Sequence, residues 1–173
     1  MRFFKPDAIF DSVTDITPAF LKKSGITALL LDVDGTLALR GSQQPLAGVP
    51  EWIEALREAG IAVSIVSNAN PGRVKPFAKK VGLPCRFFSL KPLPWGMIKA
   101  KRSLGQCAAR TAMAGDQFVN DILGANLWGM KSLYVAPPAA NKPIFPFLKK
   151  LDRYLLKRYR RALTHRKDEK FDG

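Results

Sequence analysis

Short apolar runs alternate with longer stretches of helical hydrophobic periodicity along most of the chain. The run ITALLLD at residues 26–32 is apolar on both faces and ends in an acidic residue, which is typical of an inner strand of a parallel sheet. The first helical stretch begins at Pro50 and ends before Gly60, where proline and glycine are favoured. We predict strands at 26–32, 61–66, 86–89, 111–115 and 132–135, and helices at 50–59, 71–81, 95–104 and 118–128.

This alternation predicts the α/β class, with a three-layer, doubly wound parallel sheet of the Rossmann-like kind. The length of 173 residues suits a single core. We expect residues 1–141 to form one domain that starts with an N-terminal leader segment. Residues 142–173 are expected to add a basic amphipathic helix and a disordered tail that contains His165.

Polar residues follow four of the predicted strands. In sheets of this class ligands bind beyond the carboxyl ends of the strands, so these side chains are expected to converge. They are Asp32 and Asp34 after the first strand, Ser67 and Asn68 after the second, Lys91 after the third, and Asp116 and Asp121 after the fourth.

Two carboxylates placed two residues apart suit covalent hydrolysis of a phosphoester. Asp32 would be the nucleophile that becomes phosphorylated, and Asp34 would protonate the leaving oxygen and then activate water. Gly35 would allow a tight turn close to the phosphoryl oxygens, and a hydrogen bond from Thr36 would fix that turn. The pattern therefore predicts an aspartyl-phosphate intermediate.

The acidic residues also predict a metal site, because hard oxygen ligands in small numbers favour Mg²⁺. We expect Asp32 and Asp116 to bind the ion through their carboxylates and Asp34 to bind it through its backbone carbonyl. Asp121 would hold a metal-bound water or orient Lys91.

The other polar residues would contact the phosphoryl group. Lys91 would neutralise charge between nucleophile and phosphate, while Ser67 would donate from its hydroxyl and its backbone N–H. Asn68 is expected in the same phosphate-binding set. Taken singly, each of these residues is more simply a strand-ending turn or a solvated surface group, so the prediction depends on their combination.

Four segments carry a family resemblance: DVDGTL (32–37), SNA (67–69), Lys91-Pro92 and GDQFVND (115–121). In order and spacing they resemble the motifs of the haloacid dehalogenase superfamily, and four placed motifs are far more specific than one short match. The resemblance implies a magnesium-dependent phosphatase. Aspartate at position 34 resembles the phosphatase branches and argues against dehalogenase chemistry.

The intervals between these motifs are short. About a dozen residues separate Leu37 from the helix at Pro50, and the stretch from Ser67 to Lys91 holds one helix and one strand. Many relatives insert a cap domain at these places, so we predict an open site with no large cap domain. Such a site would admit a phosphate on a bulky carrier, namely a protein, a nucleic acid end or a lipid headgroup.

The N-terminal segment carries a closer resemblance. Pro6, DITP at 15–18, Leu21 and Gly25 lead into the first catalytic strand as in the YqeG branch of the superfamily, over about residues 1–140. That branch includes phosphatidylglycerophosphate phosphatases, so the resemblance implies conversion of phosphatidylglycerophosphate to phosphatidylglycerol. Two positions depart from the branch, which often has asparagine where this chain has Gly35 and Ala69.

Positive charge is concentrated toward the C-terminus. The formal net charge is +14, and residues 142–173 contain eleven Lys or Arg against four Asp or Glu. From 144 to 163 apolar residues recur at helical spacing between basic ones, which favours an anionic membrane surface as partner. The alternative is that this apolar stripe packs against the domain.

Two other functional classes stay open from the sequence. A nucleic-acid end phosphatase would also use a basic surface, although no aromatic-rich nucleic-acid motif is present. A basic scaffold with an unused site is the non-enzymatic alternative.

Neither cysteine spacing nor hydropathy indicates a secreted or membrane-spanning protein. Cys85 and Cys107 lack disulfide or zinc spacing, and no apolar run is long enough to cross a bilayer. The sequence therefore favours a cytoplasmic protein, and a lipid substrate would require peripheral attachment to the inner membrane surface.

Overall fold

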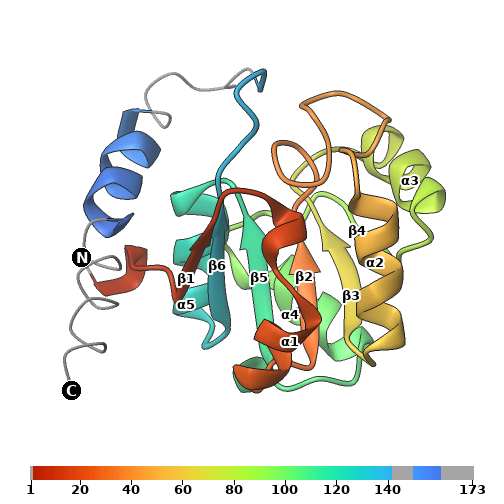
Figure 1. Ribbon diagram of the computed structural model, residues 1–173, viewed down its shortest axis with the longest axis horizontal. Coiled ribbons are helices and arrows are strands. Elements are labelled where there is room, and N and C mark those ends of the chain that lie inside the picture. Colours follow the sequence, from red (N-terminus) through yellow and green to blue (C-terminus); the bar gives the residue numbers. More distant parts are fainter. Residues whose placement is uncertain (1, 142–149, 161–173) are drawn as a thin grey trace.

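The computed structural model describes residues 2–141 and 150–160. Its centre is a six-stranded parallel sheet in the order β1-β6-β5-β2-β3-β4 (Figure 1). The strands are β1 (Ala8–Phe10), β2 (Ala28–Leu31), β3 (Ala62–Val66), β4 (Cys85–Arg86), β5 (Thr111–Gly115) and β6 (Lys131–Val135).

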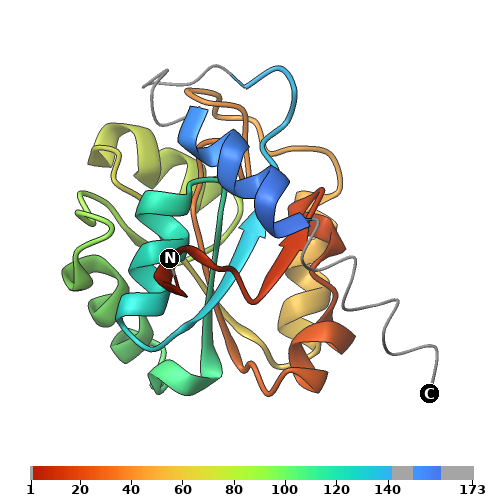
Figure 2. The ribbon, with the colours of Figure 1, turned by 90° about the vertical axis from the view of Figure 1, so that its left-hand side faces the viewer.

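Helices cover both faces of the sheet and make the three layers (Figures 1 and 2). One face carries α1 (Pro18–Lys23), α2 (Val49–Glu58) and α3 (Pro71–Lys80). The other face carries α4 (Pro94–Ser103), a π-helix (Phe118–Leu123) and α5 (Gly124–Leu127). Short 3₁₀ turns occupy Arg2–Phe4, Val13–Asp15 and Ala108–Arg110.

Strand β2 shows why this sequence folds into buried layers. Leu29 and Leu31 belong to the apolar cluster that contains Trp52 of α2, whereas Leu30 belongs to the cluster that contains Met97 of α4. Successive side chains of a strand point to opposite faces, so a strand that is covered on both sides must be apolar throughout. The predicted α/β fold with a doubly wound parallel sheet is confirmed.

Three local features differ from the sequence predictions. The strand predicted at 86–89 is present as β4, but it covers only Cys85–Arg86, and the chain turns away at Phe88, where φ is 45°. The leader segment adds β1 at an edge of the sheet and, further along the chain, α1 on one face. A strand of only three residues shows no periodicity that sequence reasoning could detect. The predicted helix at 118–128 begins as a π-helix.

The C-terminal helix packs against the domain. Residues 150–160 are helical, and Leu155 and Tyr159 are buried beside Phe118 and Tyr134. Full burial of such side chains stabilises by about 1.5–3 kcal/mol each. In the described part of this helix the apolar stripe therefore contacts the domain. The rest of the predicted amphipathic helix and the tail with His165 lie outside the described residues.

No large cap domain is present in the described part of the chain. Between β2 and α2 the loop contains two isolated bridges, Asp34 with Ala38 and Ala38 with Pro45. Between β3 and Lys91 the chain forms α3 and β4, as predicted from the interval length. No helix among residues 2–141 and 150–160 is long and apolar enough to cross a membrane.

Candidate active site

A buried lysine joins two aspartates at the carboxyl end of the sheet. The Lys91 Nζ donates to Asp32 Oδ1 at 2.7 Å and to Asp121 Oδ1 at 2.6 Å. All three side chains are almost completely buried. Burying any one of these charges alone would cost folding free energy. The three charged side chains therefore stabilise one another in the buried site.

The loop that delivers Lys91 is held by Asn68. The Asn68 amide donates to the Lys91 carbonyl at 3.0 Å, and the Lys91 N–H donates to Asn68 Oδ1 at 2.7 Å. Both the nitrogen and the oxygen of the Asn68 side-chain amide are therefore hydrogen-bonded to the Lys91 backbone. Asn68 lines the cavity, and in this structure its amide group positions Lys91, so the predicted contact of Asn68 with phosphate stays a prediction.

Three carboxylates form a compact cluster beside this lysine. Asp32, Asp116 and Asp121 each offer an oxygen within 4.8 Å of the others. Both Asp121 oxygens are used, because Lys91 binds Oδ1 and the Gln117 N–H donates to Oδ2 at 3.1 Å. The buried Asp116 Oδ1 has no hydrogen bond in the described part of the chain. The cluster therefore fits a cation held by Asp32 and Asp116. Asp121 does not take part, because both of its oxygens already accept hydrogen bonds.

Gly35 leaves space for that cation. Its φ is +97°, and an added Cβ would overlap the carboxylate of Asp116. Only glycine combines this backbone conformation with such a close approach. The turn predicted at Gly35 is thus observed, and it lies directly against the carboxylate cluster.

The electrostatics of the cluster show an excess of negative charge. Burial, together with the Asp121 and Asp34 carboxylates, raises the pKa of Asp32 to about 6, although Lys91 acts in the opposite direction. Burial and the neighbouring Asp32 and Asp121 charges raise the pKa of Asp116 well above its usual value. Burial alone would lower the pKa of Lys91, but Asp121 and Asp32 raise it. A bound cation would relieve this repulsion.

Asp34 belongs to the same cavity but has a different partner. Its Oδ1 accepts hydrogen bonds from Arg73 Nη2 at 2.8 Å, Arg73 Nε at 3.2 Å and the Gly41 N–H at 2.9 Å. Its Oδ2 has no hydrogen bond among the described residues, so one oxygen is held and the other is available for proton transfer. The sequence prediction missed Arg73, which α3 brings to Asp34 across 39 positions of sequence.

Two of the predicted phosphate contacts need correction. The Ser67 N–H donates to the Arg86 carbonyl at 2.9 Å, so β-sheet pairing uses this donor. Of the two predicted donors only the hydroxyl is left for a phosphate, and its oxygen accepts from the Ala69 N–H at 3.2 Å. The Thr36 hydroxyl is buried without a hydrogen bond in the described residues, so it does not fix the turn as predicted. Backbone bonds hold that turn, with the Thr36 N–H donating to the Val33 carbonyl at 3.2 Å.

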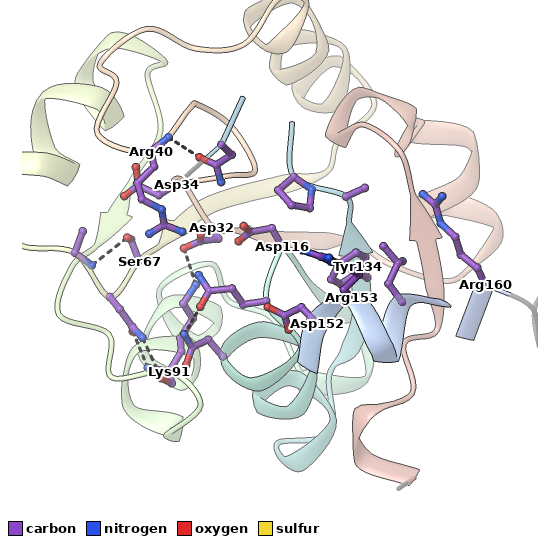
Figure 3. A pocket seen from close by; sticks show the side chains of 18 residues that line it. Asp32, Asp34, Arg40, Ser67, Lys91, Asp116, Tyr134, Asp152, Arg153 and Arg160 are labelled. Atoms are coloured by element: carbon purple, nitrogen blue, oxygen red, sulfur yellow. Dashed lines mark hydrogen bonds and ion pairs between the residues drawn. The ribbon is translucent and has the colours of Figure 1, made fainter. Parts of the chain in front are cut away.

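These residues line a cavity of about 540 Å³ that is open to solvent (Figure 3). Figure 3 shows the Asp116 carboxylate directed toward Asp32. The C-terminal helix forms part of the wall through Asp152, Arg153, Leu156 and Arg160, which sequence reasoning did not place at the site. Tyr134 and Arg40 also line it.

Asp152 anchors this wall. Its Oδ1 accepts from the Phe118 N–H at 3.0 Å, and burial raises its pKa to about 6. In the sequence Asp152 stands out as the one acidic residue in a strongly basic stretch, but that pattern does not indicate a contact with the active site. The helix that was predicted to meet lipid thus also contributes to the cavity.

Comparison with known proteins settles the family. Residues 10–129 match the family model described as haloacid dehalogenase-like hydrolase. The chain belongs to this family. It is also 32% identical over 161 residues to the Probable phosphatase YqeG of Bacillus subtilis (strain 168), which covers 92% of this chain and 94% of that protein.

Solved structures of this family share the fold. A haloacid dehalogenase family hydrolase from Streptomyces avermitilis is 24% identical, with a TM-score of 0.53 and coverage of 69% of this chain and 76% of that chain. The cobalt-bound deoxy-D-mannose-octulosonate 8-phosphate phosphatase from Haemophilus influenzae is 17% identical, with a TM-score of 0.52 and coverage of 80% and 91%.

The family membership confirms the superfamily and YqeG resemblances predicted from the motifs. It makes the protein a phosphatase of the haloacid dehalogenase type, and the scaffold alternative no longer applies. The individual roles of Asp32, Asp34 and the other site residues remain predictions that the geometry supports.

Proposed function

We propose that this haloacid dehalogenase-type phosphatase is Mg²⁺-dependent and converts phosphatidylglycerophosphate to phosphatidylglycerol through a phosphorylated Asp32. The observation that carries the proposal is the Asp32–Lys91 pair beside Asp116, whose buried Oδ1 has no hydrogen bond in the described residues. In this arrangement Lys91 fixes the position of the nucleophile Asp32, and the carboxylates of Asp32 and Asp116 fit a divalent cation.

The residues divide the reaction into two steps. The Asp32 oxygen that is not bound to Lys91 attacks phosphorus as the ester P–O bond breaks, and Asp34 gives a proton to the leaving alcohol. Water then attacks the phosphorus atom of the phosphorylated Asp32 and loses a proton to Asp34, which releases inorganic phosphate, frees the Asp32 carboxylate and returns Asp34 to its protonated form. Lys91 holds Asp32 in place through both steps.

Mg²⁺ held by Asp32 and Asp116 would neutralise charge on the phosphoryl oxygens. The cobalt-bound form of the Haemophilus influenzae phosphatase supports a divalent cation in a protein of this fold. The unpaired Asp116 oxygen and the raised pKa of its carboxyl support the same assignment here.

The open cavity supports a bulky substrate that carries two anionic groups. Phosphatidylglycerophosphate carries a terminal phosphomonoester and an internal phosphodiester, and each needs a positive partner. Arg153 lines the cavity, is exposed, and has no ion pair or hydrogen bond in the described chain, so it is available to the phosphodiester. The absence of a cap among the described residues leaves room for the acyl chains outside.

Attachment to an anionic membrane surface belongs to the same proposal. On the C-terminal helix Lys150, Lys157 and Arg158 are exposed while Leu155 is buried, so this helix offers charge to lipid headgroups. Each basic residue near an anionic surface contributes about 1 kcal/mol.

Phosphate release from phosphatidylglycerophosphate in mixed micelles tests the proposal. Wild-type protein should release phosphate with Mg²⁺ and not with EDTA, and Asp32→Asn should be inactive. A 5′-phosphorylated oligonucleotide and a small aryl phosphate serve as comparison substrates. Turnover of either comparison substrate without turnover of the lipid would remove the substrate assignment and leave the phosphatase intact.

A further inference from the structure

Exposed large apolar side chains gather in one short segment. Of the seven exposed large apolar side chains in the described residues, four lie between β4 and the first turn of α4. They are Phe88, Leu90, Leu93 and Trp95, with exposed fractions from 51% to 62%. We call residues 88–95 the apolar loop. A concentration of this kind on a folded surface marks an interaction site.

The backbone directs two of these side chains outward. Phe88 and Leu90 have φ values of 45° and 56°, the left-handed region that residues with bulky side chains rarely adopt. The residues that follow each of them, Ser89 and Lys91, are buried. The Ser89 N–H donates to the Ser67 carbonyl at 3.0 Å and fastens the loop to the site. The loop thus keeps its polar residues inside and its apolar residues in solvent, in a strained conformation.

Positive charge surrounds the apolar loop. From residue 59 to residue 115 the sequence contains ten Lys or Arg and no Asp or Glu. Arg86 directly precedes the loop and is exposed. Lys99 and Arg102, also exposed, follow Trp95 at positions i+4 and i+7 of α4, so they lie on the same side of that helix. Apolar side chains within a basic surface are complementary to an anionic lipid bilayer.

The apolar loop also adjoins the catalytic residues. Its Lys91 reaches Asp32 at 2.7 Å, while the neighbouring Leu90 points into solvent. A bilayer that received the apolar loop would therefore lie beside the open cavity. On the described part of the C-terminal helix Leu155 and Tyr159 are buried in the domain, and Tyr154 is the one large apolar side chain that is exposed, so the apolar loop offers more apolar surface than this helix.

We propose that the apolar loop is the membrane-docking element of this protein and that it inserts Phe88, Leu90, Leu93 and Trp95 into the headgroup region of an anionic bilayer. The choice of a lipid surface over an acidic protein rests on the proposed function, because a membrane-bound phosphate must reach Asp32 from a docked position. The surrounding basic residues attract the bilayer, and the apolar side chains hold it.

The test compares vesicle binding of wild-type protein with Phe88→Asn/Leu90→Asn. Asparagine tolerates the left-handed conformation, so this pair removes apolar surface without adding backbone strain. Leu127→Gln is the matched control, since Leu127 is an exposed leucine on α5, outside the apolar loop. Sedimentation uses phosphatidylcholine vesicles with and without phosphatidylglycerol. Thermal unfolding and turnover of a small aryl phosphate verify that each variant is folded.

We expect wild type to sediment with the phosphatidylglycerol vesicles, the double variant to bind them about tenfold more weakly or worse, and Leu127→Gln to bind as wild type. Turnover of the aryl phosphate should be the same for all three. Equal binding by wild type and the double variant, equal loss in the control, or no binding by wild type would each overturn the proposal.

Trp95 provides a direct report of insertion. Of the three tryptophans, Trp52 is buried and Trp128 half-buried, whereas Trp95 is 62% exposed. Its emission should shift to shorter wavelength when phosphatidylglycerol vesicles are added, and lipids brominated on the acyl chain should quench it. An unchanged spectrum on bound vesicles would contradict insertion by this loop.

Failure of the docking proposal and failure of the proposed function give different results. If Phe88→Asn/Leu90→Asn loses vesicle binding but wild type does not hydrolyse phosphatidylglycerophosphate, docking stands and the substrate assignment falls. If the lipid is hydrolysed in micelles but vesicle binding is independent of these side chains, the function stands and the docking assignment falls.

Discussion

Neutralising Asp32 is expected to abolish activity and yet stabilise the metal-free protein at neutral pH. The pKa of Asp32 rises from 3.8 to about 6 because of burial and the neighbouring carboxylates. A rise of this size corresponds to about 3 kcal/mol of folding free energy. An acid with a raised folded pKa contributes stability that is fully present below the unfolded pKa and is lost as pH rises through the folded value.

The sign and the pH window follow from this shift. At pH 8 in EDTA, Asp32→Asn should be more stable than wild type by up to about 3 kcal/mol, or about 6–12 °C in Tm. At pH 4 most of this difference should be gone, because the wild-type carboxyl is then almost fully protonated in the folded protein and partly protonated in the unfolded chain. The amide oxygen can still accept from Lys91, and Lys91 keeps its bond to Asp121 at 2.6 Å.

Thermal and chemical unfolding in EDTA at pH 4 and pH 8 measure this effect. Mg²⁺ should reduce or reverse the difference at pH 8, since it stabilises the wild-type carboxylates by binding. Asp34→Asn is the control, because that carboxylate is already paired with Arg73 and its neutralisation should bring no gain in stability. An Asp32→Asn protein that is no more stable than wild type at pH 8, or equally more stable at both pH values, would refute the reasoning.

Three further variants test the site. Lys91→Met should destabilise the protein by about 3–5 kcal/mol in denaturant titrations at pH 8, since it leaves the two carboxylates that Lys91 bridges without a cation. Arg73→Gln should lower kcat about tenfold with little change in KM, because Arg73 orients Asp34, and a change in KM alone would contradict that role. Arg153→Gln should raise KM for phosphatidylglycerophosphate about tenfold, whereas Arg158→Gln, exposed on the same helix but outside the cavity, should leave KM unchanged.

The central part of the fold was predictable because its determinants are local. The apolar run at 26–32 predicts a strand that is buried on both faces, and this prediction does not require knowing which helices cover it. The strand predicted at 111–115 has the same bounds as β5. The acidic and basic residues after these strands were predictable as one group, because parallel strands bring their carboxyl ends to one edge. Lys91, Asp32, Asp116 and Asp121 do meet there.

The partners of individual atoms were not predictable from the motifs. The spacing places Ser67 and Asn68 at the site, but it does not reveal that sheet pairing uses the Ser67 N–H or that the Asn68 amide binds the Lys91 backbone. These assignments depend on which group lies within hydrogen-bond distance after the strands are aligned. A motif specifies residue types, whereas bond partners follow from register and loop path.

By itself, the sequence determined the class of fold, the edge of the sheet that carries the chemistry and the absence of a large cap in the described chain. Tertiary structure decided that Arg73 holds Asp34, that the C-terminal helix forms a wall of the cavity, and that the apolar loop faces solvent. The physical reason is separation along the chain: hydrophobic periodicity and motif spacing act over a few residues, whereas packing joins residues such as Phe118 and Tyr159 only after the whole chain has folded.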